Sequence, residues 1–518
     1  MGLMTRLLQT GMMVLVMGSL SSCGGGGGGG GSSPPPFEMA YVLEESSSSF
    51  SGQIEYFPMN PGNGTFYPDS GASPVPTGGS VPISLLSDPT NSNYLYALNN
   101  NNTTTDGTNA GSVQGFSAAG YQKTMSAVGG STLTGPNPVS MAIDPGGHYL
   151  VVADHGSGQT CSSSSSCGDV SVFTISSGSV SPYGTLKATS SNPSPLCANP
   201  FRVVFLPGAT GSSSDTVIVA CSSPEIWGQS NNPGVAVYAC TISGIQKGNS
   251  CVSLVSSNNF NQFVSLADFA LVNFLFVPGT SIAVGPVLSG SSSSGSGYPT
   301  GYLLVCDFSS VSNSSCSTSL SPIYTTSNFL PSGNVAFTGS GSSATLYVGN
   351  YDPSSSSFTP TTYSEFSTCS SWTTVSASCN SPIAVNSSST PGPIYFYTTG
   401  GTLYIAATGT PIIGSYTGSS TSSSSGTISS STAPASGTLY ACPVSGITSA
   451  SSGSCSPQTT GYWPVSITTD PQTGNYLFVA TLSGTVNLYS GASSGKLSSL
   501  TGPTLASGYL PLSVLVLQ

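Results

Sequence analysis

The stretch PVSMAIDPGGHYLVVAD, residues 138–154, contains the unit that decides the fold. It predicts a β-strand opened by Pro-x-Ser, a turn at Asp-Pro, and a second apolar strand that ends at Ala153. Openers of the same kind stand at Pro82, Pro464 and Pro511. Self-similarity at a spacing of about 50 to 70 residues, built only from strands and turns, is typical of a β-propeller.

The repeat predicts an all-β propeller of four-stranded blades. Eight blades follow from counting the expected first strands, and seven blades are the alternative. These first strands are expected near Ser80, Pro138, Pro200, Phe269, Gly333, Pro393, Pro464 and Pro511.

The two ends of the chain are expected to share one blade. Pro511 opens a first strand after which the chain stops, whereas Met39–Leu43 has the pattern of a second strand with no first strand before it. Pairing of these two segments would close the ring and remove two exposed sheet edges.

The amino-acid composition excludes some classes of function. Only 4% of the 518 residues are charged, and the net charge is −11. Such a surface repels phosphate, so nucleic acid is not an expected partner. No long segment has the 3.6-residue apolar period of a helix.

The N-terminus has the pattern of an export signal, with Arg6 before a short apolar run and small residues before Cys23. Leu20-Ser-Ser-Cys23 resembles the bacterial lipobox, which implies cleavage before Cys23 and lipidation of that residue. The predicted division is a signal peptide at 1–22, a lipidated Cys with a Gly/Pro tether at 23–36, and one propeller domain at 37–518. The expected location is a membrane surface reached through the lipid anchor, by analogy the bacterial outer membrane.

Twelve further cysteines in an exported chain predict disulfides. Four pairs bracket the turn after a third strand, and two more would tie a serine-rich loop and the entry of one blade. The expected pairs are Cys240/Cys251, Cys306/Cys316, Cys369/Cys379, Cys442/Cys455, Cys161/Cys167 and Cys197/Cys221. The cysteines and the two histidines do not cluster at ligand spacing, so no metal or cofactor is expected.

Residues 138–154, with the strand Asp169–Ile175, resemble one repeat of the lactonase-like, YVTN-type propellers, and the similarity extends weakly over 37–518. The resemblance implies a propeller, usually of seven blades, and a Pro-Arg-His segment at the active site. This chain has Pro200-Phe-Arg202 there and no His in any first strand.

Loops into first strands and out of second strands share the face at the mouth of the channel, which is the expected ligand site. The candidate residues on it are Arg202, Asp154, His155, Glu225 and Trp227. Because titratable groups are few, the expected function is non-catalytic binding of a protein or glycan, without enzyme activity. A lactonase-type hydrolase acting on a small lactone or sugar lactone is the alternative.

Overall fold

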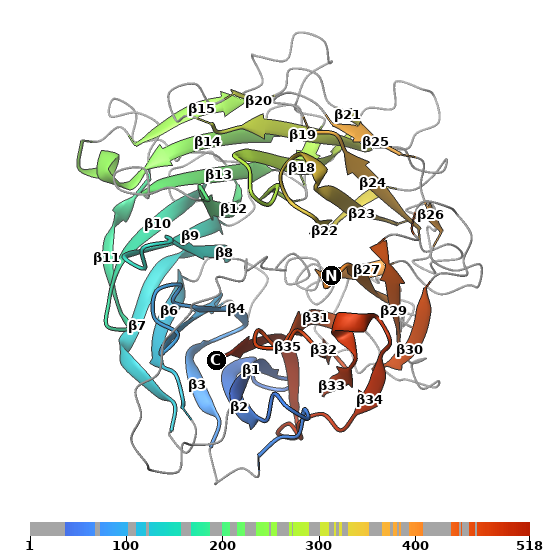
Figure 1. Cartoon of the computed structure of the whole chain (residues 1–518). Coiled ribbons are helices and arrows are strands. Elements are labelled where there is room, and N and C mark those ends of the chain that lie inside the picture. Colours follow the sequence, from blue (N-terminus) through green and yellow to red (C-terminus); the bar gives the residue numbers. More distant parts are fainter. Residues whose placement is uncertain are drawn as a thin grey trace, which may run out of the picture.

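The computed structural model describes most of the chain from Phe37 onward. The described residues are 37–67, 73–101, 110–120, 124–156, 167–186, 199–207, 215–222, 235–247, 250–255, 269–271, 273–289, 301–309, 315–316, 321–323, 330–351, 365–372, 377–380, 383–384, 393–407, 437–444, 447, 455–461 and 464–518. They form eight antiparallel sheets arranged as blades around a ring (Figure 1). The predicted eight-bladed, all-β propeller is confirmed. The predicted signal peptide, Cys23 and tether lie outside the described residues.

Four blades cover the first half of the ring. The split blade, in sheet order, contains β35 (Tyr509–Leu517), β1 (Glu38–Ser46), β2 (Ser51–Met59) and β3 (Val75–Ser80). The next blade contains β4 (Pro82–Ser87), β5 (Tyr94–Asn99), β6 (Ala110–Ser117) and β7 (Ser126–Pro136). The third contains β8 (Pro138–Ile143), β9 (Tyr149–Gly156), β10 (Cys167–Ser176) and β11 (Ser179–Thr185), and the fourth β12 (Pro200–Phe205), β13 (Thr216–Ser222), β14 (Val235–Thr241) and β15 (Cys251–Val255).

The other four blades complete the ring. The fifth contains β16 (Phe269–Leu271), β17 (Leu275–Phe276), β18 (Ile282–Ser289), β19 (Gly301–Asp307), β20 (Ser315–Cys316) and β21 (Ser321–Pro322). The sixth contains β22 (Leu330–Thr338), β23 (Thr345–Tyr351), β24 (Glu365–Ser370), β25 (Ser378–Cys379) and β26 (Ile383–Ala384). The seventh contains β27 (Pro393–Thr399), β28 (Thr402–Ala407), β29 (Gly437–Pro443) and β30 (Ser456–Thr460), and the eighth β31 (Pro464–Thr469), β32 (Tyr476–Thr481), β33 (Thr485–Ser490) and β34 (Ser498–Leu500). Short 3-10 turns are η2 (Ile242–Lys247), η5 (Gly341–Ser343) and η7 (Ala492–Ser494).

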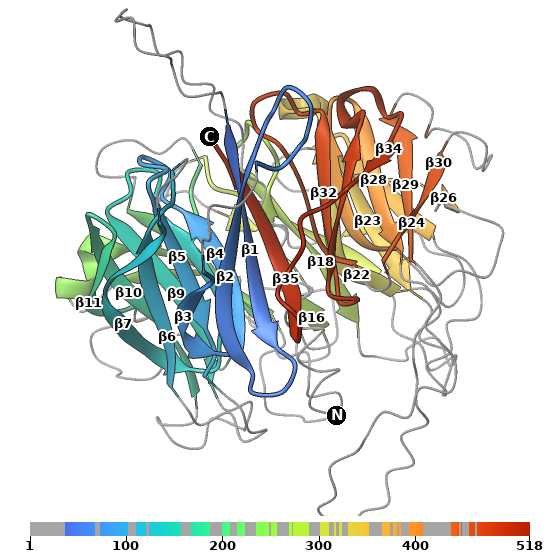
Figure 2. The same cartoon turned by 90° about the horizontal axis from the view of Figure 1, so that it is seen from below.

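The chain ends close the ring as predicted. β35 is the innermost strand of the split blade and pairs antiparallel with β1, from Met39 opposite Leu517 to Ser46 opposite Tyr509. The two strands lie side by side in both views (Figure 2). A β-bulge between Leu43 and Glu44 shifts the register of β1 against β35. Closure therefore depends on a sheet built from residues more than 400 positions apart.

Apolar side chains on both faces of the second strands build the core. Every residue of β28 and β32 is buried. Odd and even positions of a strand face opposite neighbours, as strand geometry requires. In β9, Leu150 and Val152 pack toward the second blade, whereas Val151 and Ala153 pack toward the fourth. The core is therefore a series of apolar layers between blades.

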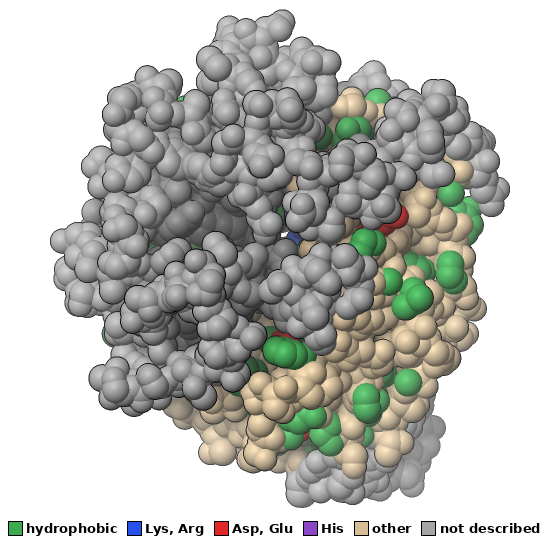
Figure 3. Space-filling view, turned by 180° about the vertical axis from the view of Figure 1, so that it is seen from behind, with side chains coloured by type: hydrophobic (Ala, Val, Ile, Leu, Met, Phe, Trp, Pro, Cys, Tyr) green, Lys and Arg blue, Asp and Glu red, His purple; other side chains and the backbone are tan. Residues whose placement is uncertain are grey.

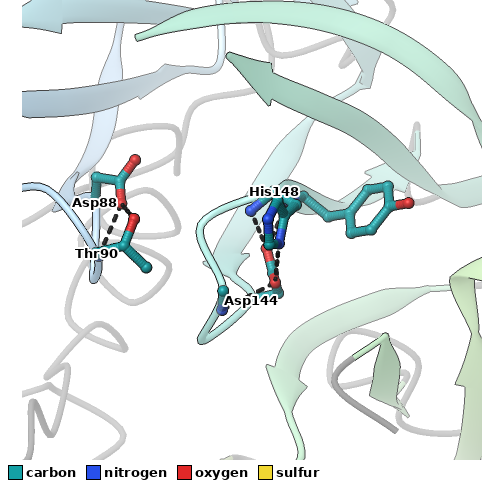
Figure 4. Close-up of polar contacts among 6 residues, drawn as sticks. Asp88, Thr90, Asp144 and His148 are labelled. Carbon is teal, nitrogen blue, oxygen red and sulfur yellow. Dashed lines mark hydrogen bonds and ion pairs between the residues drawn. The ribbon is translucent and has the colours of Figure 1, made fainter. Parts of the chain in front are cut away.

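Three of the chain's few carboxylates accept hydrogen bonds within the turn that joins the first and second strands of a blade. Asp144 accepts backbone N–H bonds from Gly146, His148 and Tyr149, and an oxygen of Asp144 lies 3.6 Å from His148 Nδ1 (Figure 4). Asp88 accepts from both the backbone and the hydroxyl of Thr90 at 2.8 Å (Figure 4). The equivalent turn residue of the eighth blade, Asp470, accepts from several backbone N–H groups of its own turn. These Asp-Pro segments are structural turns.

Four predicted disulfides are confirmed: Cys240–Cys251, Cys306–Cys316, Cys369–Cys379 and Cys442–Cys455. They lie in four consecutive blades and join the third strand to the outermost one. Cys221 is also disulfide-bonded, but its expected partner Cys197 lies outside the described residues, as does Cys161. Disulfides of this number are typical of exported proteins, and the chain is one of them.

The Cys306–Cys316 bridge supports a very short outer strand, since β20 has only two residues. Replacing both cysteines by serine should reduce stability by about 3 kcal/mol, the chain-entropy value for a loop of this size. Hydrogen exchange should also speed up at Cys306 and Asp307, which pair with β20. The control is the same change at Cys240 and Cys251, where β15 has five residues and should keep its protection. Unchanged exchange in the first variant would contradict the role given to the bridge.

Candidate functional site

One position at the end of the second strand repeats around the ring, directly opposite the proline that opens the first strand. We call these residues the belt. The proline–belt pairs are Pro511–Glu44, Pro82–Asn99, Pro138–Asp154, Pro200–Cys221, Pro331–Asn350, Pro393–Ala407 and Pro464–Thr481. All are buried. The belt marks the face that the sequence predicts as the ligand-binding face.

Polar belt residues bond mainly to the third strand of their own blade. Gln53 donates to Glu44 at 2.8 Å, and Asn350 donates to the Ser367 hydroxyl at 2.8 Å. Burial raises the pKa of Glu44 to about 8, so this acid is largely protonated at neutral pH. The belt is thus a set of buried polar contacts that tie neighbouring strands together.

Asp154 is a belt residue and has a second acid beside it. Asp169 of β10 stands directly opposite Asp154 in the register, and the Ser171 hydroxyl donates to Asp154 Oδ2 at 2.6 Å. Burial, and then the nearby Asp169 carboxylate, raise the pKa of Asp154 well above its usual value. Burial also raises the pKa of Asp169. Asp154 faces the second blade, where Gly135 lies against it.

His155 follows Asp154 along β9 and points to the opposite side of the sheet, toward the fourth blade. Its backbone N–H donates to the Asn137 carbonyl at 2.9 Å. Burial lowers the pKa of His155 to about 4, so the imidazole is neutral at physiological pH and is a weak base. Although adjacent in sequence, Asp154 and His155 therefore face different blades.

Arg202 lies on the innermost strand of the fourth blade, at the position where four other blades have the Ser of Pro-x-Ser (Ser84, Ser140, Ser466 and Ser513). The Ser140 hydroxyl, at this position in the third blade, accepts the backbone N–H of Val203 at 3.4 Å. Ser466 accepts the N–H of Val514 in the same way at 3.3 Å. This position therefore faces the inner strand of the next blade. In the space-filling view from behind, one basic side chain lies in a hollow near the centre of the ring (Figure 3).

The Arg202 side chain is part-buried and has no acidic partner among the described residues. Nε of Arg202 is buried without a hydrogen-bond partner. Among residues in the described ranges, the one ion pair joins His148 to Asp144, so no described carboxylate neutralises Arg202. Burial lowers the pKa of Arg202 to about 10, which leaves the side chain cationic at neutral pH. The residue is the single arginine after Arg6.

The predicted site residues do not converge on one point. Asp154 faces the second blade, His155 the fourth, and Arg202 shares its side of β12 with Val204, which packs toward the fifth. Glu225 and Trp227 lie outside the described residues. The described part of β13 ends at Ser222, and Cys221 pairs with Pro200 at the entry of β12.

Sequence reasoning did not identify Asp169 as a site residue, nor the glycines that pack against the belt. A Cβ on Gly135 would lie 2.8 Å from Asp154 Cβ, and one on Gly79 would lie 2.7 Å from Asn99 Cβ. Gly461 has the same close approach to Thr481. Each glycine stands three residues before the proline of a first strand. The Gly-x-x-Pro spacing was the signal that could have located this contact.

The described residues contain neither a cluster of metal ligands nor a membrane-spanning helix. No group of three or more His, Cys, Asp or Glu side chains lies close enough together there to hold a metal ion. Nor does that part of the chain contain a helix long and apolar enough to cross a membrane.

No described protein family matches the sequence, and no curated protein matches it. Among solved structures, the chain is similar to the periplasmic gluconolactonase PpgL of Pseudomonas aeruginosa, with 11% identity over 93% of this chain and 99% of that one and a TM-score of 0.48. A Bacteroides fragilis protein assigned as a 6-phosphogluconolactonase has 11% identity over 93% and 98%, with a TM-score of 0.44. AztD of Citrobacter koseri has 10% identity over 93% and 98%, with a TM-score of 0.46.

These comparisons correct one prediction. Two of the similar structures are named as lactonases, which matches the alternative prediction and not the preferred one, a non-catalytic binding module. The lactonase-like propeller architecture agrees with the resemblance noted in the sequence. At these identities and TM-scores the likeness is one of architecture, and any argument for an activity depends on this chain's own residues.

Proposed function

We propose that this protein is a hydrolase of small lactones, with Arg202 at the channel mouth as the group that stabilises the oxyanion. The observation that carries the proposal is the part-buried guanidinium on the innermost strand of the fourth blade, which has no acidic partner among the described residues. A buried charge without a partner is costly. Such groups are found preferentially at functional sites.

Lactone hydrolysis is a reaction that a single strong hydrogen-bond donor can accelerate. Water attacks the lactone carbonyl carbon, and negative charge develops on the carbonyl oxygen, where the Arg202 fork can donate two hydrogen bonds. The ring C–O bond then breaks, and its oxygen takes a proton to become a hydroxyl group. The product carboxylate stays beside the same cation. A removed oxyanion donor typically costs 10²–10³-fold in rate, so one group of this kind supplies a useful acceleration.

We assign the proton-accepting role to Glu225 and a stacking role to Trp227. Glu44 and Asp154 are unsuited to the base role because they are fully buried between blades. Glu225 follows Ser222, the last residue of β13, by three positions in the sequence. A carboxylate can act as a general base toward water, and a Trp ring offers an apolar face to a sugar ring.

The test uses exported full-length protein carrying Cys23→Ser, which lacks a lipid, and glucono-δ-lactone as the probe. A pH-stat should record saturable acid release above the spontaneous rate. Gluconate should inhibit competitively, because its carboxylate would pair with Arg202. Release at the spontaneous rate, at every protein concentration used, would refute the proposal.

We also propose that the exported chain is held on a membrane, in the outer membrane of a bacterium, through lipid on Cys23. The lipobox-like sequence and the glycine-rich tether support this proposal. Cys23→Ser should abolish labelling by radioactive palmitate and move the protein from the membrane fraction to the soluble one. Cys221→Ser, which removes a disulfide cysteine, is the control and should keep the label. A Cys23→Ser protein that still sediments with membranes after signal cleavage would contradict lipid anchoring.

A further inference from the structure

Two carboxyl groups meet between the second and third blades with free oxygens. Asp154 and Asp169 are directly opposed in neighbouring strands, and Asp154 is fully buried. Ser171 occupies Oδ2 of Asp154, but Oδ1 of Asp154 and Oδ1 of Asp169 are both buried with no hydrogen-bond partner. Buried acceptor oxygens are rarely left without a donor or a cation.

Other blades place a donor at the equivalent third-strand position. Gln53 stands opposite Glu44, Ser112 opposite Asn99, and Thr485 opposite Thr481. In the sixth blade the acid Glu365 stands opposite Asn350, whose amide group can itself donate. Among the described pairs, Asp154 with Asp169 is the one in which two acids oppose each other. No Lys or Arg in the described ranges forms an ion pair with either of them.

The second blade packs a glycine against the pair. Gly135 lies over the pair, and a Cβ there would come within 2.7 Å of Asp169 Oδ1 and 2.8 Å of Asp154 Cγ. A hydrogen bond from the neighbouring Thr134 hydroxyl partly offsets the rise in the pKa of Asp154. Asp169 is part-exposed as a residue, whereas its Oδ1 atom and the whole of Asp154 are buried.

We propose that Asp154 and Asp169 hold a calcium ion between the second and third blades. The donor atoms are oxygens only, two of them from carboxyl groups that a bound cation would hold ionised, and hard cations prefer such ligands. A cation would satisfy both free oxygens and remove the repulsion between two buried charges. Ca²⁺ tolerates irregular geometry and mixed protein and water ligands, whereas Mg²⁺ demands a near-ideal octahedron.

The expected affinity is modest. With two carboxylates and few further protein ligands, the Kd should be about 10⁻⁴–10⁻³ M, the range of extracellular calcium modules. Because an ion bound only to the folded state stabilises it, calcium should raise the thermal midpoint. This cation site has no part in the proposed lactone chemistry, since Asp154 faces the second blade and Arg202 the fifth.

The experiment uses the same unlipidated full-length protein, treated with a chelator and then dialysed against radioactive calcium. One ion should bind per chain, and the thermal midpoint should rise with calcium concentration. Asp169→Asn should weaken binding at least tenfold while the protein stays folded, because the amide can donate to Asp154. Glu44→Gln, the belt residue of the split blade, is the matched control and should bind calcium like the wild type.

Two results would overturn the proposal. One is wild-type protein that binds no calcium at about 10 mM, well above the expected Kd. The other is calcium binding that Asp169→Asn leaves unchanged. A calcium-insensitive midpoint that rises as the pH falls would identify a shared proton instead. The sign follows because burial raises the pKa of both carboxyls in the folded state, which then takes up protons as the pH falls.

Discussion

Removal of Tyr509–Gln518 is expected to prevent the chain from folding into a stable ring. The deletion takes away β35, the inner strand of the split blade, and leaves the inner edge of β1 without its ladder. Val514 and Val516 of β35 are buried, and each contributes roughly 2 kcal/mol by burial alone. With the lost strand pairing, the total approaches the whole stability of a typical domain, about 5–15 kcal/mol.

Thermal unfolding by circular dichroism, together with the yield of soluble protein, would measure this effect. Deletion of Gln518 alone is the control, because that residue is exposed and follows the end of β35. The exposed edge of β1 should make the truncated chain prone to aggregation. Equal midpoints for the two deletions would contradict closure by the split blade.

Arg202→Met is expected to reduce kcat/KM for glucono-δ-lactone by about 10²–10³-fold, the usual effect of losing an oxyanion donor. Arg202→Lys should recover only part of the rate, because an ammonium group keeps the charge but lacks the planar fork. Ser84→Ala, at the equivalent first-strand position in the second blade, is the matched control and should leave turnover unchanged. Equal rates for Arg202→Met and wild type would remove Arg202 from the reaction.

Local and periodic features of this chain could be predicted from its sequence. Pro138 and Pro464 open first strands because an apolar run with Pro-x-Ser follows the same pattern in each repeat. The hairpin disulfide Cys369–Cys379 was predictable because two cysteines flank a short turn. The split blade followed from an opener at Pro511 with no continuation and a strand near Met39 with no opener.

The direction of side chains between blades could not be read in the same way. Asp154 and His155 are sequence neighbours, yet strand alternation sends them toward different blades. The opposition of Asp154 and Asp169 depends on the register of β9 with β10, across a loop whose length does not set that register. Gly135 touches Asp154 only once two blades are packed together.

The most direct test of the role proposed for Arg202 measures lactone turnover and thermal stability on the same preparations of wild type and Arg202→Met. Arg202 lacks a described acidic partner, and replacing an unpaired buried charge by an apolar side chain is often neutral or stabilising. We therefore expect kcat/KM to fall by about 10²–10³-fold while the thermal midpoint stays the same or rises. A midpoint that falls together with activity would show that Arg202 is a structural residue, and turnover that persists would place the chemistry elsewhere.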